Sequence, residues 1–171
     1  MQAIILQPPY PESPNPDAAQ ACLDWMTARM GELQPDRTDA VLLPEYATAP
    51  GLDEAGALFS FADQAGSVFL EKLRGEARRL RAYVVVGTVA VAGARRFFNR
   101  TLVLDPSGAT VAWYDKTHLT EVEQVQLGLT PGGKPGVCEL GPWRAGIAVC
   151  FDIYFPEYFE TLAAADTRLI F

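Results

Sequence analysis

Short apolar runs alternate with longer amphipathic segments through the first half of this chain, and that alternation limits it to a layered α/β fold. Apolar runs at residues 3–7 and 40–43 predict buried strands. Apolar residues spaced by three or four predict helices over about 16–33 and 60–80, the first with Asn15 as its N-cap. Strand and helix thus alternate twice, which favours helices packed on the face of a sheet.

The hydrophobic period changes to that of strands after residue 82. Residues 83–91 and 97–104 predict two strands joined by a hairpin around Gly93-Ala94-Arg95-Arg96. Further elements are expected in this order: a turn at 105–108, a strand at 109–114, loops over 117–143, a strand ending at Cys150, a helix from Pro156 to about Ala165 and the start of a strand at 168–171. We therefore expect a single α/β domain over residues 1–171 with a mixed sheet.

The composition of the chain limits the kinds of partner that it can bind and the cellular compartment in which it is expected. The chain has 171 residues, of which 49% are hydrophobic, and a net charge of −7. This balance argues against a nucleic acid or an anionic membrane surface as partner, and no apolar stretch approaches the length of a membrane span. Three widely spaced cysteines form no disulfide framework, and the N-terminus lacks the basic region of a secretory signal. We expect a cytoplasmic protein.

Three residues that can carry chemistry follow apolar runs: Glu45, Lys116 and Cys150. Reactive groups in sheet folds are often displayed where strands end and loops begin. An acid, an amine and a thiol at one rim would supply a general base, an oxyanion stabiliser and a nucleophile. The leading hypothesis is therefore hydrolysis through a thioester intermediate.

Each of these residues also has a simpler interpretation. Taken alone, Cys150 is more often a small buried hydrophobe, Glu45 a capping loop carboxylate, and Lys116 a surface lysine paired to Asp115. His118, the only histidine, is weighed as the partner of a Cys-His dyad, but a structural role is favoured. A zinc site is disfavoured because its would-be ligands lack zinc-finger spacing: Cys22, Cys138, Cys150 and His118.

Taken as a set, the segments resemble the nitrilase superfamily of carbon–nitrogen hydrolases over essentially the whole chain. The matching motifs are Leu43-Pro44-Glu45, Lys116-Thr117-His118-Leu119 and the run from Cys150 to Glu157, Cys-Phe-Asp-Ile-Tyr-Phe-Pro-Glu. A Pro-Gly step at Thr130-Pro131-Gly132 agrees as well. Three motifs in the same order, each with suitable secondary structure around it, make the resemblance specific.

The resemblance implies a four-layer α-β-β-α sandwich that forms a homodimer or higher oligomer. It implies that Glu45 is the general base, that Cys150 is the nucleophile, and that Lys116 and the backbone N–H of Phe151 stabilise the oxyanion. It implies no metal and no cofactor. Family members continue past the cysteine helix, whereas this sequence ends at Phe171 within a predicted strand. We therefore expect the sandwich to be incomplete at its C-terminus.

Many family members also have a second glutamate between the lysine and the cysteine. We assign it to Glu123, with Glu121 as the alternative. Tyr46, Phe151 and Tyr154 are expected to bind substrate because they adjoin the catalytic positions, although ordinary aromatic packing would also explain them.

The resemblance further implies hydrolysis of a non-peptide C–N bond in a small amide or N-carbamoyl compound. Phe151-Asp152 follows the cysteine where nitrile-cleaving members tend to have Trp-Glu, which favours the amidase and carbamoylase branches. The alternatives are nitrile hydrolysis, acyl transfer at the same site, and a non-catalytic binding module that keeps the fold.

Overall fold

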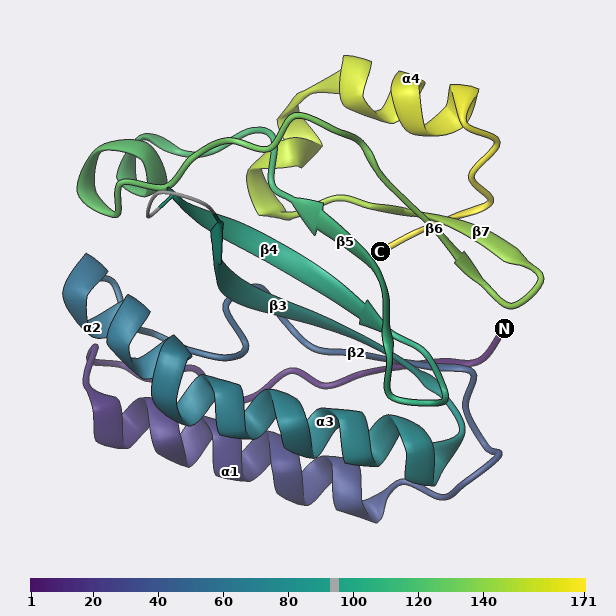
Figure 1. Ribbon diagram of the computed structural model, residues 1–171, viewed down its shortest axis with the longest axis horizontal. Helices are drawn as coiled ribbons and strands as arrows, with labels where there is room; N and C mark the ends of the chain where they lie inside the picture. Colours follow the sequence, from purple (N-terminus) through teal and green to yellow (C-terminus); the bar gives the residue numbers. More distant parts are fainter. Residues whose placement is uncertain (93–95) are drawn as a thin grey trace.

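Two β-sheets lie between outer helices in the computed structural model, which describes residues 1–92 and 96–171 (Figure 1). The first sheet has the order β1-β2-β3-β4-β5, parallel from β1 to β3 and antiparallel from β3 to β5. Its strands are β1 Ala3–Ile5, β2 Ala40–Leu42, β3 Tyr83–Ala92, β4 Arg96–Leu104 and β5 Thr110–Asp115. The second sheet contains β6 Gly136–Leu140, β7 Trp143–Ile147 and β8 Leu169–Ile170.

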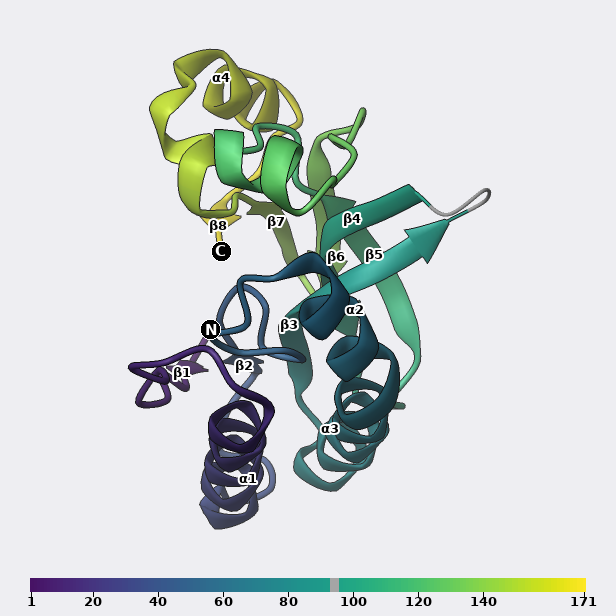
Figure 2. The ribbon, with the colours of Figure 1, turned by 90° about the vertical axis from the view of Figure 1, so that its left-hand side faces the viewer.

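Helices cover the outer face of each sheet, so the predicted four-layer α-β-β-α order is confirmed (Figures 1 and 2). α1 Pro16–Glu32 and α3 Ser67–Leu80 pack on the five-stranded sheet, and α4 Pro156–Ala164 packs on the second sheet. α2 Ala55–Phe61 runs through a π-helical turn, η1 Ala62–Gly66, into α3. Two short segments complete the list: η2 Val122–Gln126, also π-helical, and η3 Cys150–Tyr154, a 3-10 helix.

Two of the three hydrophobic clusters among the described residues hold these layers together. Met26, Leu73 and Val84 belong to the core between the helices α1 and α3 and the first sheet. The core between the two sheets includes Val103 and Ile147, and buried side chains of α4 belong to the same cluster. Burial of such side chains contributes about 1.5–3 kcal/mol each, so the facing sheets form a rigid base for residues at their ends.

Most predicted elements are confirmed with small shifts. The Asn15 side chain accepts a hydrogen bond from the Ala18 N–H at 2.8 Å, so it caps α1 as expected. The helix predicted from residue 60 begins earlier, at Ala55. The π-helical turn ends at Gly66, where an added Cβ would lie 2.4 Å from the Thr48 carbonyl oxygen. A glycine at that position lets the helix approach the loop after β2 closely.

Two other regions differ from the prediction. Residues 117–143, expected to be rich in loops, also contain η2 and the strand β6, which pairs with β7 and was not predicted. The strand expected to end at Cys150 stops at Ile147, because the backbone turns into η3 at Cys150. The hairpin predicted around Gly93-Ala94-Arg95-Arg96 has its first three residues outside the described part of the chain. Among the described helices, none combines the length and hydropathy that crossing a membrane would require.

Candidate active site

Glu45 and Lys116, which lie 71 residues apart in sequence, form an ion pair at one end of the first sheet. Lys116 Nζ lies 2.8 Å from Glu45 Oε1. The same ammonium also donates to both carboxylate oxygens of Glu123, at 3.1 and 2.9 Å. One buried cation therefore holds two carboxylates, and two of the three predicted catalytic residues are in direct contact.

Lys116 directly follows β5 and is almost fully buried, with 1% of its surface exposed. Its backbone N–H donates to the carbonyl oxygen of Asn99 on β4. Gly132 packs against the same segment, because an added Cβ there would lie 1.9 Å from the Asp115 carbonyl oxygen. The Pro-Gly step found in the sequence thus leaves room for the backbone that carries Lys116.

The charge of Lys116 is maintained by its two acidic neighbours. Burial alone lowers the pKa of the Lys116 ammonium, but the carboxylates of Glu45 and Glu123 outweigh it and raise the pKa above its usual value. The group is therefore a fixed positive charge at neutral pH.

Glu123 is the acidic residue of η2 that reaches this ion pair. Burial raises its pKa, but hydrogen bonds from the Thr120 backbone and the side chains of Lys116, Asn99 and Tyr46 bring the pKa below its usual value. Its carboxylate accepts from the Thr120 N–H at 2.8 Å. Glu121, the alternative left open by the sequence, is exposed to solvent. The structure thus brings Glu123 to Lys116.

Asn99 bridges the two carboxylates and was missed by the sequence analysis. Its Nδ2 donates to Glu45 Oε1 at 2.6 Å and to Glu123 Oε1 at 2.7 Å. It is the residue on β4 that faces Lys116 across the β4–β5 pair, on the side of the strand that points to the second sheet. A polar side chain on the same inward-facing side of β4 as the buried Val103 was the available signal.

Glu45 occupies a tight turn just after β2. The Tyr10 hydroxyl donates to the Glu45 carbonyl oxygen at 2.7 Å. Tyr46 has a left-handed backbone with φ of 54°, and its hydroxyl donates to Glu123 Oε1 at 2.7 Å. Burial, with help from Glu123 and Glu45, raises the pKa of Tyr46 well above its usual value. Tyr46 is therefore a neutral donor that ties this turn to Glu123.

Cys150 begins the turn that follows β7 and is solvent-exposed, whereas Cys22 and Cys138 are buried. Its backbone is left-handed, with φ of 46°, a conformation that costs a residue with a Cβ roughly 1–2 kcal/mol. Strained backbone of this kind often marks functional positions. The turn places the thiol at the mouth of the space between the sheets.

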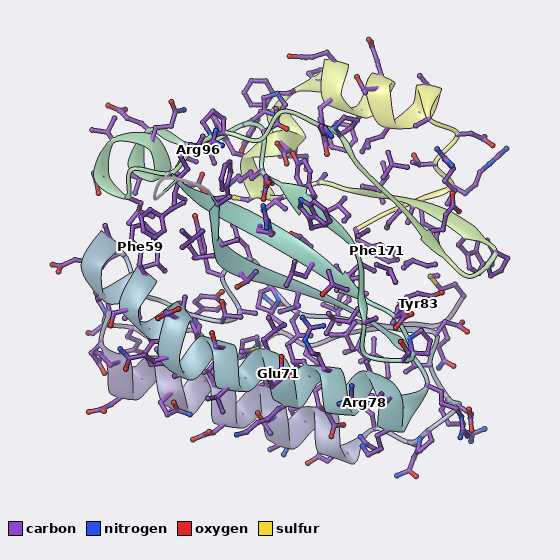
Figure 3. All side chains as sticks on the ribbon, in the orientation of Figure 1. Phe59, Glu71, Arg78, Tyr83, Arg96 and Phe171 are labelled. Carbon is purple, nitrogen blue, oxygen red and sulfur yellow. The ribbon has the colours of Figure 1, made fainter. Side chains whose placement is uncertain are left out.

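A small cavity lies between Cys150 and Glu45, the acidic member of the ion pair. Glu45 and Cys150 both line this cavity, which has a volume of about 140 Å³ and is otherwise mainly apolar. Phe171, labelled in Figure 3, lines it from the end of the chain. Burial and the negative charge of Glu45 raise the pKa of the Cys150 thiol, and Lys116 lowers it by less. The free thiol is therefore protonated at neutral pH.

His118 is held by Asp152 rather than by the thiol. The ring nitrogen Nδ1 lies 2.7 Å from Asp152 Oδ1, and the ring stacks on Phe155 at a centroid distance of 3.8 Å. This geometry agrees with the structural role favoured from the sequence. Within residues 1–92 and 96–171, no group of three or more His, Cys, Asp or Glu side chains is placed to hold a metal ion.

The aromatic residues expected to bind substrate have different surroundings. Tyr46 is engaged with Glu123, as described above. Phe151 and Tyr154 pack on each other with ring centroids 5.5 Å apart, and Tyr154 is 73% exposed. Their contact with a substrate stays a prediction.

Comparison with known proteins places this geometry in context. The carbon–nitrogen hydrolase family model matches residues 3–171. The 2-oxoglutaramate amidase of Bacillus subtilis (strain 168) is 29% identical over 140 residues, which cover 82% of this chain and 53% of that protein. The chain thus spans about half the length of this curated relative.

Solved structures agree on the fold. An amidase from Nesterenkonia sp. superposes with a TM-score of 0.75 at 23% identity, covering 99% of this chain and 63% of the amidase. A variant of the amidase from Nesterenkonia sp. AN1, with a TM-score of 0.73 at 22% identity and the same coverage, carries the acetamide moiety of fluoroacetamide on its active-site cysteine.

Proposed function

The chain belongs to the carbon–nitrogen hydrolase family, and on that premise we propose that it hydrolyses the C–N bond of a small amide or N-carbamoyl compound through a thioester on Cys150. One observation carries the proposal: Glu45 is paired with Lys116 at 2.8 Å and lines the same cavity as the exposed thiol of Cys150. A base and a nucleophile thus line one small space, and a fixed cation is paired with the base.

In the first step, Glu45 takes the proton from the thiol as the sulfur attacks the carbonyl carbon. A raised thiol pKa makes this transfer necessary, because little thiolate exists before substrate binds. The carbonyl oxygen becomes an oxyanion, stabilised by the Lys116 ammonium and the backbone N–H of Phe151. Because the pKa of Lys116 is raised, Lys116 acts as a charge and keeps its proton.

In the second step, Glu45 returns the proton to the leaving amine, and the C–N bond breaks. The acyl group is then held as a thioester on Cys150. Glu45 next accepts a proton from a water molecule, whose oxygen attacks the thioester carbon. The C–S bond then breaks, the acid is released, and Glu45 returns its proton to the sulfur, which restores the thiol and the ionised Glu45. Glu123, held in its ionised form, keeps Lys116 charged and in place throughout the cycle.

Amides are the first choice among the substrates. The Bacillus subtilis relative is named as an amidase of 2-oxoglutaramate, and the solved Nesterenkonia variant carries the acetamide moiety of fluoroacetamide on its active-site cysteine. The apolar lining of the cavity suits a short uncharged acyl chain. The Phe151-Asp152 pair after the nucleophile also favours amides and N-carbamoyl compounds over nitriles.

The test uses the full-length protein with small amides, ω-amides, N-carbamoyl compounds and nitriles. Substrate is mixed with enzyme, the reaction is quenched in acid, and mass spectrometry locates the acyl group. We expect an adduct on Cys150 alone, and turnover that is lost in Cys150→Ala. Cys22→Ala and Cys138→Ala are matched controls that keep most activity. Turnover in Cys150→Ala comparable to wild type would reject the mechanism.

A further inference from the structure

The carboxylate of Asp152, two residues after Cys150, is completely buried and accepts four hydrogen bonds. Its Oδ2 accepts from the Val149 N–H at 2.9 Å and from the Tyr114 hydroxyl at 2.8 Å. Its Oδ1 accepts from the His118 N–H at 3.2 Å and is 2.7 Å from His118 Nδ1. Such a set of donors is what a buried carboxylate requires.

These donors come from segments that carry the two proposed reactive groups. Val149 directly precedes Cys150, while Tyr114 and His118 each lie two residues from Lys116. Tyr114 lies on β5 of the first sheet, and Val149 follows β7 of the second. One carboxylate therefore joins the two sheets at the site.

The contacts fix both backbones close to the reactive residues. The hydrogen bond to the Val149 N–H closes the turn in which Cys150 has its left-handed φ. On the other side, the Tyr114 hydroxyl, itself bonded to Asp152, accepts the Thr117 N–H at 2.9 Å. The residues immediately before Cys150 and immediately after Lys116 are thus both tied to the network around one side chain.

We propose that Asp152 is the positioning residue that holds the Cys150 thiol in register with the Lys116 ammonium, and that the His118 ring serves it as a hydrogen-bond donor. This inference rests on the function proposed above. It gives His118 a role that needs no proton transfer to substrate, only an N–H at Nδ1 directed at the carboxylate.

Four variants of the full-length protein test this assignment. Asp152→Asn keeps the size but replaces one acceptor oxygen with an amino group that would face N–H donors. His118→Leu removes the ring donor, whereas His118→Asn places an amide N–H close to where Nδ1 lies. Asp166→Asn alters an exposed acid that also has a left-handed backbone, and serves as the control.

Two readouts are measured for each variant: kcat and KM for an amide, and the pH profile of Cys150 alkylation by iodoacetamide. We expect Asp152→Asn and His118→Leu to lose at least tenfold in kcat with less than a threefold change in KM. His118→Asn should keep at least five times the kcat of His118→Leu, and Asp166→Asn should match wild type.

The alkylation profile distinguishes positioning from simple removal of charge. If the thiol moves away from the Glu45–Lys116 pair, the midpoint shifts to lower pH in both Asp152→Asn and His118→Leu, because Glu45 raises the thiol pKa by more than Lys116 lowers it. Loss of the Asp152 charge alone would lower the midpoint in Asp152→Asn but not in His118→Leu, so an unchanged or higher midpoint in His118→Leu overturns the proposal. If Asp152→Asn does not fold, the two His118 variants decide, and equal kcat values for them overturn it. If wild type cleaves no amide, the proposed function fails while the alkylation profiles still test Asp152.

Discussion

Gly87 on β3 lies directly against the backbone of Glu45, so close that an added Cβ would be 2.7 Å from Glu45 Cα and 2.5 Å from the Pro44 carbonyl oxygen. A substitution to alanine must therefore displace the turn that presents the proposed base. Gly87→Ala should cost about 1–3 kcal/mol of unfolding free energy, as overpacking does. It should also lower kcat/KM at least tenfold, beyond what the loss of folded protein explains.

The matched control is Gly75→Ala in α3, where an added Cβ meets nothing within 4 Å. This change should stabilise the protein by about 0.5–1 kcal/mol and leave activity intact. Urea denaturation and steady-state kinetics measure both effects. Equal activity in the two variants would show that the close contact at Gly87 has no influence on Glu45.

Glu45→Gln should separate thiol acidity from catalysis. The charge of Glu45 raises the pKa of the Cys150 thiol, whereas Lys116 lowers it. Removing the carboxylate should therefore lower the thiol pKa, so that iodoacetamide alkylation becomes half-maximal at a lower pH than in wild type. Amide hydrolysis should nevertheless fall a hundredfold or more, because the base is lost. A midpoint that moves upward would contradict the charge assignment.

Glu123→Gln and Glu121→Gln form a pair that tests which glutamate supports Lys116. Glu123→Gln should lower kcat at least tenfold and cost about 3 kcal/mol of stability, because it removes a buried partner of a cation. Glu121→Gln, at an exposed position, should change neither. Similar losses in both variants would count against the assignment of Glu123.

The stability difference between wild type and Glu123→Gln should depend on pH with a defined sign. The pKa of Glu123 is lower in the folded protein than its reference value of 4.5. Its contribution to stability is therefore fully present above about pH 4.5 and is lost as the pH falls through the lower folded pKa. The stability gap between wild type and Glu123→Gln, measured by urea denaturation at several pH values, should narrow on acidification. A gap that widens would refute this linkage.

Cys150→Gly and Cys150→Ala should differ in stability although both lack the thiol. The residue has a φ of 46°, which glycine adopts readily and alanine does not. The free energy of unfolding of the glycine variant should therefore be about 1 kcal/mol larger than that of the alanine variant. Both should be inactive. A more stable alanine variant would mean that the turn relaxes when the thiol is removed.

The sequence was informative about the fold where hydrophobic period and capping signals were strong. Asn15-Pro16 located the start of α1 to the residue, and the alternating apolar residues located β3 and β4. It failed at β6, a five-residue strand flanked by Pro135 and Gly141. The strand β6 forms because it pairs with β7, which is a tertiary contact. Its flanking proline and glycine are residues typical of turns, so the local sequence favoured a loop.

Only some residues of the candidate site could be predicted from local sequence patterns. Glu45, Lys116 and Cys150 stand out because each follows an apolar run, and Glu123 was the preferred second acid. Asn99 was not identified, and Asp152 was noted only within the motif after the cysteine, since their contacts are to residues 54 and 34 positions away. Long-range hydrogen bonds of this kind have no local periodicity to reveal them.

The distances along the chain between the site residues also have a consequence for how the protein folds. The Lys116–Glu45 contact closes a loop of 71 residues, and the Tyr46–Glu123 hydrogen bond spans 77. Contacts of such high sequence separation form slowly, because their loop-closure entropy must be overcome before they stabilise the chain. Helices α1 and α3 contain mostly local contacts and can form earlier. During refolding, the pH profile of Cys150 alkylation should therefore become native only after the helical circular-dichroism signal has recovered. The Cys150 thiol would then be a kinetic probe for the docking of the two sheets.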